Sequence, residues 1–143
     1  MKKLLMFVAL LVMVMALVGC SGSNKPVFNL ADPISAIKSN MLAFETKDVD
    51  SYMKSISSDT PGYGSTKKMI AKLFDAYTFK IELKNLKVVS QKDKEAQVGF
   101  TQIMKKVKGP DFKDNQIDGV HTLIKGDTGW QIYNTEIKSV KYL

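Results

Sequence analysis

The chain has 143 residues, of which 45% are hydrophobic, and 21 basic against 14 acidic side chains give a formal net charge of +7. This length fits one compact domain and excludes two domains of ordinary size. The apolar content excludes a wholly disordered chain. A single cysteine excludes a disulfide-stabilised scaffold.

The amino terminus has the pattern of a bacterial export signal. Two lysines precede an unbroken run of fifteen apolar residues, 4–18, which is shorter than the ~20 residues that a membrane-spanning helix needs. Leu17-Val18-Gly19-Cys20 follows at once and resembles a lipobox, in which small residues precede a lipidated cysteine. We therefore expect a signal peptide over residues 1–19, lipidation of Cys20 and a flexible tether over 20–30. The alternatives are a secretory signal with an incidental cysteine and a plain anchor helix.

Lipidation of Cys20 would fix both the location and the partners of the protein. Two or three acyl chains hold a protein stably on a membrane, so we expect it on the extracytoplasmic face of the cell membrane. Ser21 after the cysteine favours the outer membrane in an organism that has one. Without residues 1–19 the net charge is +5, from 19 lysines and 14 acidic residues. The absence of arginine argues against nucleic acid as a partner, whereas anionic lipids or wall polymers suit a cationic domain.

The first element expected after the tether is a helix. Asp32 followed by Pro33 is a favourable start, with Asp as the N-cap and Pro in the first helical position. Apolar side chains then recur at helical spacing. They are Ile34, Ile37, Met41 and Phe44.

Two further helices are expected before Thr78, where the spacing of the apolar residues changes. Asp48 or Asp50 can cap a short helix, and Ser65 or Thr66 can cap a longer one after the Ser-, Pro- and Gly-rich break at 57–64. The expected apolar faces are Val49, Tyr52, Met53 and Ile56 for the short helix, and Met69, Ile70, Leu73, Phe74 and Tyr77 for the longer one.

From Thr78 onward the apolar residues alternate with a period of two, as in β-strands. The alternation slips near Asn85, which predicts a β-bulge in a long first strand. A turn at 92–94, a polar loop that begins at Lys108, and a tight hairpin at Gly126–Gly129 then separate three more strands.

Three helices followed by four antiparallel strands predict an α+β fold with the helices packed on one face of the sheet. Two groups of residues add detail: Ile37, Phe44, Val49 and Tyr52 in the opening helices, and Gly129-Trp130-Gln131-Ile132 near the end. Together with the element order they resemble the nuclear-transport-factor-2-like (cystatin-like cone) superfamily, in particular its small secreted bacterial members, many of them lipoproteins. The resemblance covers residues 31–142 and implies a curved sheet that wraps a long helix and leaves a conical cavity, in a domain over 31–143. It also leaves open a homodimer through the sheet.

The last hairpin allows the cavity lining to be predicted from strand register. If Gly126–Gly129 is the turn, the cross-strand pairs on one face are Lys125 with Trp130, Leu123 with Ile132, His121 with Asn134, and Gly119 with Glu136. Because that face carries Leu123 and Ile132, we expect it to be the concave, helix-facing one. Gln102 of the second strand and Tyr52 of the second helix are expected to reach the same space. The candidate cavity-lining residues are therefore Tyr52, Gln102, His121, Asn134 and Glu136.

His121 has two interpretations. It can be a general base or hydrogen-bonding group that Glu136 orients, or a histidine hydrogen-bonded at a wet cavity mouth. Superfamily enzymes such as ketosteroid isomerases and dehydratases place an Asp/Tyr or an Asp/His pair in the cavity. Asp118 falls on the opposite strand face from His121, so the resemblance carries no such pair onto this chain, and we expect no catalytic residue.

We also expect no metal site and no cofactor. One histidine and no available cysteine leave scattered carboxylates, and the spacing of Asp111, Asp114 and Asp118 departs from a calcium-binding EF-hand loop. Glycine-rich phosphate loops and nucleophile elbows are absent from the sequence. The expected function is a membrane-anchored module that binds a small molecule or an envelope protein. The alternatives are a small isomerase or dehydratase that uses His121 with Glu136 or Tyr52, and a purely structural envelope protein whose cavity is filled by side chains.

Overall fold

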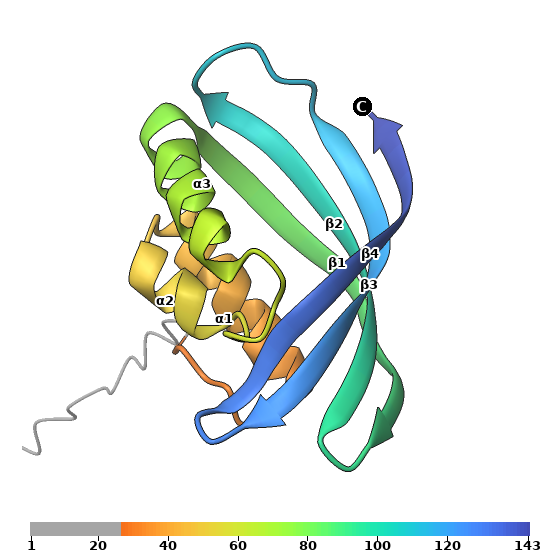
Figure 1. Cartoon of the computed structure of the whole chain (residues 1–143). Coiled ribbons are helices and arrows are strands. Elements are labelled where there is room, and N and C mark those ends of the chain that lie inside the picture. The colour runs from red at the N-terminus through yellow and green to blue at the C-terminus, as the bar shows by residue number, and fades with distance from the viewer. Residues whose placement is uncertain (1–26) are drawn as a thin grey trace, which may run out of the picture.

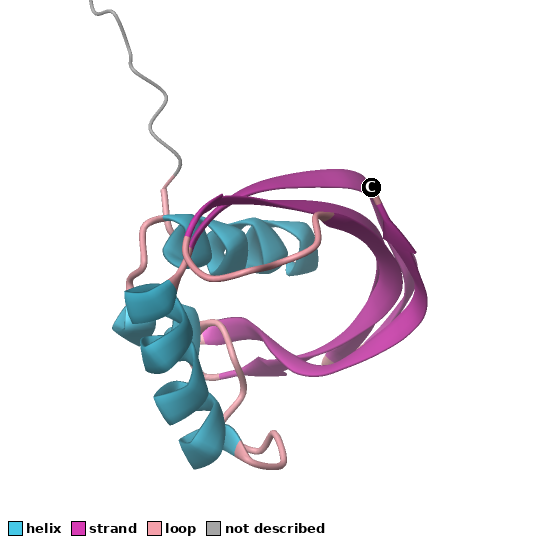
Figure 2. Cartoon of the chain, turned by 90° about the horizontal axis from the view of Figure 1, so that it is seen from above, coloured by secondary structure: helices cyan, strands magenta, loops and turns pink. Residues whose placement is uncertain are grey.

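The computed structural model describes residues 27–143, in which three helices are followed by four strands (Figure 1). The elements are α1 (Pro33–Glu45), α2 (Val49–Lys54), α3 (Tyr63–Ala76), β1 (Thr78–Lys92), β2 (Glu95–Lys108), β3 (Asn115–Gly126) and β4 (Gly129–Tyr142). The strands form one antiparallel sheet in the order β1-β2-β3-β4. The sheet curls toward the helices, which lie on its concave side (Figure 2). The predicted fold class is confirmed, whereas the expected signal peptide, Cys20 and the first part of the expected tether lie outside the described residues.

Helix α1 begins as its sequence predicts. The Asp32 carboxylate accepts a hydrogen bond from the Ser35 backbone N–H at 2.9 Å, and Pro33 occupies the first turn. This N-cap satisfies a backbone donor that the helix itself leaves without a partner. The buried face of α1 lies over the sheet and consists of Pro33, Ala36, Ile37, Ser39, Asn40, Ala43 and Phe44.

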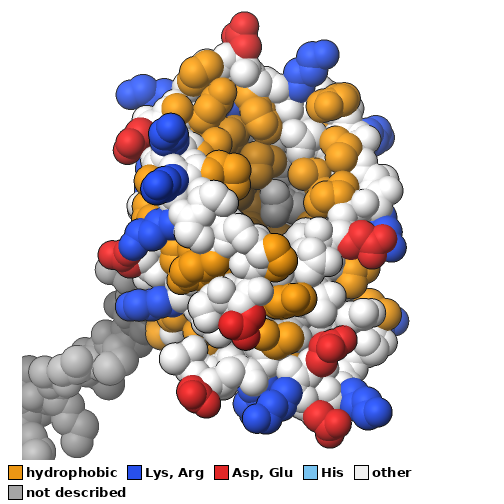
Figure 3. Space-filling view, viewed as in Figure 1, with side chains coloured by type: hydrophobic (Ala, Val, Ile, Leu, Met, Phe, Trp, Pro, Cys, Tyr) orange, Lys and Arg blue, Asp and Glu red, His pale blue; other side chains and the backbone are white. Residues whose placement is uncertain are grey.

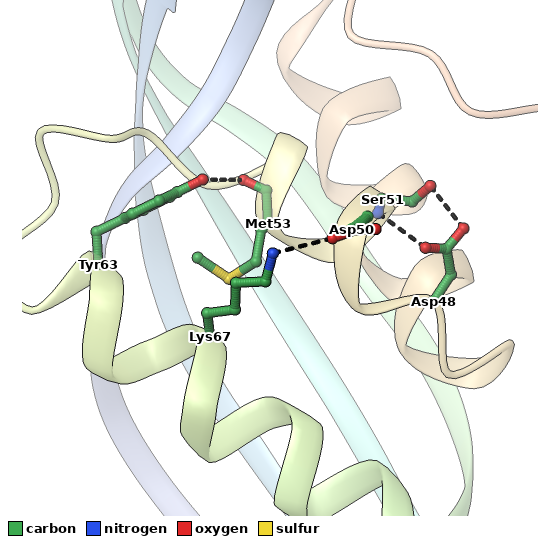
Figure 4. A network of polar contacts seen from close by, with 6 residues as sticks. All are labelled: Asp48, Asp50, Ser51, Met53, Tyr63 and Lys67. Atoms are coloured by element: carbon green, nitrogen blue, oxygen red, sulfur yellow. Dashed lines mark hydrogen bonds and ion pairs between the residues drawn. The ribbon is translucent and has the colours of Figure 1, made fainter.

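Helix α2 is capped by Asp48, one of the two residues that the sequence offered. Its carboxylate accepts from the Ser51 backbone N–H at 2.9 Å (Figure 4). Asp50 instead forms an exposed ion pair with Lys67 of α3 at 3.1 Å. The Tyr63 hydroxyl donates to the Met53 carbonyl at 3.4 Å, so α3 is fastened to α2 at two points.

Helix α3 begins earlier than predicted. The expected caps, Ser65 and Thr66, lie inside the first turn, and their hydroxyls donate to the Gly62 carbonyl. The N-cap is Gly62, in the left-handed conformation with φ 77°, and it makes no side-chain cap. Glycine is favoured here because other residues pay a steric penalty at positive φ.

The bulge in β1 and the turns between the strands lie where the sequence predicts them. Asn85 has φ 54°, and the β1–β2 register shifts between Lys84 and Lys87, so the predicted bulge is present. Such a bulge increases the local bend and twist of a strand. The β1–β2 turn contains Asp93 at φ 49°, and Gly126 pairs with Gly129 across the last hairpin as predicted.

Two hydrophobic clusters hold the helices on the sheet. One lies beneath the first half of α1 and is centred on the fully buried Ile37, Val98 and Leu123. The second joins the end of α1 to α3 and β1, and its aromatic core is Phe44, Phe74 and Phe79. The rings of Phe44 and Phe74 meet edge to face, with centroids 5.2 Å apart, a favoured aromatic geometry.

The segment before α1 is fixed against the β3–β4 hairpin. The Asn29 backbone N–H donates to the Ser39 hydroxyl at 2.7 Å, and the Trp130 N–H donates to the Leu30 carbonyl at 2.8 Å. A Cβ on Gly129 would lie 2.5 Å from the Leu30 carbonyl oxygen, so this approach requires glycine. Among the described residues, helices are too short or too polar to cross a bilayer.

Candidate functional site

A cavity of about 240 Å³ lies between the concave face of the sheet and the helices. Its lining comes from α1, α2, the segment after α2 and all four strands. Figure 3 shows a hollow with hydrophobic side chains gathered around it. The polar lining residues are Asn40, Tyr52, Gln102, His121 and Thr135, and the apolar ones are Met41, Phe44, Ile56, Ile81, Phe100, Met104, Ile117, Ile132 and Ile137.

His121 is the most constrained polar group of this cavity. Its side chain is 6% exposed, and its ring stacks on Phe100 with centroids 4.1 Å apart and planes 13° apart. The Nδ1 atom lies 2.8 Å from the Thr135 hydroxyl oxygen. The other ring nitrogen, Nε2, is buried and has no hydrogen-bond partner among the described residues.

Gly119 makes the stacking possible. It pairs with Phe100 across the β2–β3 ladder. A Cβ at this position would lie 2.8 Å from Phe100 Cζ and 2.6 Å from the Glu136 carbonyl oxygen. The Phe100 ring therefore occupies space that only a glycine leaves free.

Burial sets the charge of the imidazole. Desolvation lowers the pKa of His121 from 6.5 to about 4, because a low-dielectric environment disfavours the cation. The ring is thus neutral at pH 7. Its Nε2 atom can donate or accept a hydrogen bond according to the tautomer that the contact with Thr135 selects.

The predicted register of the last hairpin is correct near the turn and wrong beyond it. Lys125 faces Trp130 and Leu123 faces Ile132, but the register shifts between Thr122 and Leu123. His121 consequently faces Thr135, not Asn134, and Gly119 faces Ile137, not Glu136. One extra residue in a strand reverses which face each later side chain occupies.

This shift in register changes which of the predicted residues line the cavity. Tyr52, Gln102 and His121 line the cavity, whereas Asn134 and Glu136 are exposed and are not among the lining residues. Glu136 forms an ion pair with Lys138 instead of orienting His121. Thr135, and not the predicted Glu136, contacts the His121 ring. The signal for the bulge was present, since the apolar residues of β4 change from even to odd positions between Ile132 and Ile137.

Two polar residues from the helices complete the lining. Asn40 of α1 was not predicted from the sequence; it is 2% exposed, and its Nδ2 donates to the Ser55 hydroxyl at 2.8 Å. Tyr52 of α2 contacts Phe44 and Phe74, and burial raises the pKa of its phenol. Both side chains are uncharged at pH 7, like every other group that lines the cavity.

Asp118 lies on the convex face of the sheet, as its position relative to His121 predicted. Its carboxylate accepts hydrogen bonds from Thr101 at 2.6 Å and from Ser139 at 2.9 Å, and these bonds hold its pKa below the usual range. Asn85 donates to Thr101, so the network reaches all four strands. Among residues 27–143, His, Cys, Asp and Glu side chains do not gather in threes as they would around a metal ion.

These features define a cystatin-like, nuclear-transport-factor-2-like cone with an apolar cavity and one buried imidazole. The family model described as "Anti-sigma-I factor RsgI9, C-terminal domain" matches residues 35–143, and the chain belongs to this family. A curated relative, anti-sigma-I factor RsgI9 of Acetivibrio thermocellus, is 31% identical over 96 residues. That match covers 67% of this chain but spans only 13% of the length of the relative.

Solved structures show the same fold at low sequence identity. One is a protein of unknown function with a cystatin-like fold from Nostoc punctiforme, with a TM-score of 0.60, 13% identity and coverage of 76% of this chain and 87% of that one. Another is a protein of the NTF2-like family from Streptomyces avermitilis, with a TM-score of 0.59, 15% identity and coverage of 70% and 87%. A ketosteroid isomerase-like protein from Erwinia carotovora atroseptica has a TM-score of 0.58, 18% identity and coverage of 74% and 93%.

Proposed function

We propose that this protein is a membrane-anchored, extracytoplasmic module whose cone cavity binds a small molecule. The observation that carries the proposal is the buried, unpartnered Nε2 of His121, a residue that lines the cavity. A buried polar atom without a partner costs about 1–3 kcal/mol. A ligand that bonds to Nε2 would remove this cost while it covers apolar surface.

The anchoring part of the proposal rests on the lipobox at Cys20 and on where the domain begins. Asn29 and Leu30 lie against the β3–β4 hairpin. The lining residues Met104 and Ile117 lie toward the other end of the strands, near the β2–β3 loop. A lipid on Cys20 would therefore leave this part of the cavity on the side away from the membrane.

Membership of the family also bears on the choice of partner. The curated relative is named an anti-sigma-I factor, but this chain corresponds to a small part of its length. A sigma factor acts in the cytoplasm, whereas an exported domain lies across the membrane from it. We therefore assign ligand binding, and not sigma-factor binding, to this domain.

A fragment screen tests the proposed function. The full chain, in lipid nanodiscs, is heated with each member of a set of small neutral and charged compounds. A compound at about ten times its Kd should raise Tm by about 4 °C. His121→Leu should lose this shift, whereas Asn134→Ala, which changes an exposed residue of the neighbouring strand β4, should keep it. A screen in which no compound stabilises the wild type would overturn the proposal.

A cavity enzyme of isomerase or dehydratase type is the second candidate function. It is favoured by the presence of His121 and Tyr52 in one cavity, His121 from β3 and Tyr52 from α2. Glu136 cannot take part, because it is exposed and paired with Lys138. Turnover of a bound ligand that His121→Leu abolishes would favour the enzyme over the binding module.

The remaining alternative, a purely structural envelope protein, predicts a cavity that is filled by aromatic and Met side chains. The cavity retains about 240 Å³ and an unpartnered polar atom. Both observations favour a bound molecule over a solid core.

A further inference from the structure

The lining of the cavity restricts the charge of its ligand. A quarter of the chain is charged, at 24% Asp, Glu, Lys and Arg, yet among residues 27–143 none of these side chains lines the cavity. The imidazole is neutral at pH 7 because of its burial. An ion entering this space would lose its hydration without meeting an opposite charge. The cavity therefore suits an uncharged molecule.

The size and walls of the cavity restrict the ligand further. A cavity of about 150 Å³ lined by apolar side chains accommodates benzene, and this one has about 240 Å³. It therefore takes one substituted six-membered ring, whereas a molecule of several fused rings would protrude. The rings of Phe44, Tyr52 and Phe100 and the sulfur atoms of two methionines form walls suited to a flat apolar ring.

The hydrogen-bonding position identifies the polar group of the ligand. His121 is held by its stacking on Phe100 and by the contact of Nδ1 with Thr135, so the orientation of its ring is fixed, and its buried Nε2 has no partner among the described residues. Either tautomer can satisfy the contact with the Thr135 hydroxyl, which both donates and accepts. A ligand hydroxyl can likewise bond to Nε2 in both cases, whereas a carbonyl fits only the tautomer in which Nε2 is protonated.

Resting on the function proposed above, we propose that the ligand is an uncharged molecule about the size of a substituted benzene ring, which places one hydroxyl group on His121 Nε2. The ring lies against the apolar walls, and the hydroxyl supplies the partner that Nε2 lacks among the described residues.

Four probes of nearly equal size test the ligand class: benzyl alcohol, toluene, benzoate and benzylammonium. Each is titrated into the full chain in lipid nanodiscs, and binding is followed by the amide NMR signals of Thr135 and Ile137. Empty nanodiscs give the correction for partition of each probe into lipid. Benzyl alcohol should saturate one site, toluene should bind about tenfold more weakly for lack of one hydrogen bond, and the two ions should not saturate.

Three variants test whether His121 causes the preference for benzyl alcohol over toluene. His121→Phe should bring the affinity ratio of benzyl alcohol to toluene close to one, because no ring nitrogen remains. Thr135→Val leaves His121 in place without its Nδ1 partner and should lower the ratio, which covers the case that His121→Phe does not fold. Asn134→Ala should keep the tenfold ratio.

The outcomes separate this inference from the proposed function. Equal affinity for toluene and benzyl alcohol in the wild type, or an ion that binds as tightly as benzyl alcohol, would overturn the ligand class while the cavity still binds. Absence of binding by all four probes would also overturn the ligand class. The fragment screen then decides whether the binding function stands or falls with it.

Discussion

At the scale of single residues, His121 is the group on which the proposed ligand binding depends. It is the only histidine of the chain, and it is held between the Phe100 ring and the Thr135 hydroxyl. Burial lowers its pKa to about 4. A neutral, fixed and partly unsatisfied imidazole is suited to recognising an uncharged polar group.

The depressed pKa of His121 predicts a pH-dependent stability. The unfolded imidazole binds its proton near pH 6.5 and the folded one only near 4, so the unfolded state binds more protons between these values. The contribution of the neutral His121 to the free energy of unfolding is fully present above pH 6.5 and is lost as the pH is lowered toward 4. In urea unfolding, the free energy of unfolding should be about 2–3 kcal/mol lower at pH 4.5 than at pH 7.5 because of this group.

A His121→Phe variant is the control for that loss. It retains the carboxylates, so any acid destabilisation that they cause persists in it. The variant should lose about 2–3 kcal/mol less than the wild type between the same two pH values. Equal losses in both proteins would contradict the burial of a neutral His121.

Gly119 offers a second test at this scale. In Gly119→Ala the new Cβ would lie 2.8 Å from Phe100 Cζ and 2.6 Å from a backbone oxygen. We expect a loss of about 2–3 kcal/mol in the free energy of unfolding, together with a change in the His121 ring NMR signals as Phe100 moves. Gly126→Ala is the matched control, because its Cβ would meet only the end of Gln131 at 3.5 Å; it should change stability by less than about 0.5 kcal/mol.

At the scale of secondary-structure elements, two neighbouring aspartates of α2 should behave differently. Asp48→Ala removes the N-cap of the helix and should cost about 1 kcal/mol. Asp50→Ala removes only an exposed ion pair with Lys67 and should cost no more than about 0.5 kcal/mol. Urea unfolding of both variants measures the difference, and equal effects would contradict the assignment of Asp48 as the cap.

The elements also show what could be predicted from the sequence. Helix α1 and the last hairpin follow from local chemistry: an Asp-Pro start in one case, and a Gly-flanked turn with alternating apolar residues in the other. The cap of α3 was missed because Gly62 acts through its backbone conformation, which leaves no side-chain signal. In the site, Tyr52, Gln102 and His121 follow from periodicity, and Asn40 does not, because a polar residue on a helix gives no sign of burial.

The register of β4 shows how far cross-strand pairs can be predicted by counting outward from a turn. A turn determines the pairs beside it, such as Leu123 with Ile132. It does not determine the pairs beyond a bulge, whose presence depends on how the strand bends round the cavity. The apolar residues of β4 indicate this bulge in the same way as the slip near Asn85 indicates the first one, because they change from an even position at Ile132 to an odd one at Ile137.

At the scale of the whole molecule, the cavity and the start of the domain lie toward opposite ends of the sheet. The segment at Leu30 rests on the β3–β4 hairpin, and the lining of the cavity extends to Met104 and Ile117, near the β2–β3 loop. The expected lipid on Cys20 is ten residues from Leu30, a distance of at most about 36 Å along an extended chain.

This arrangement predicts how the domain sits on a membrane. With a gadolinium-chelating lipid in the nanodisc, amide signals of the hairpin residues Asp127 and Thr128 should broaden more than those of Lys113 in the β2–β3 loop. Cys20→Ser, which removes the attachment point, should abolish the broadening of both. Stronger broadening at Lys113 would contradict the proposed orientation.

The proposed ligand binding requires His121 to offer a neutral, unpartnered Nε2 to the ligand, and the ¹⁵N NMR spectrum of this single histidine reports on both properties. Both ring nitrogens should keep the shifts of a neutral imidazole from pH 7.5 to 5. Saturating benzyl alcohol should then move the Nε2 signal by more than the Nδ1 signal. A titration midpoint near pH 6.5, or an Nε2 signal that no bound molecule moves, would contradict the account.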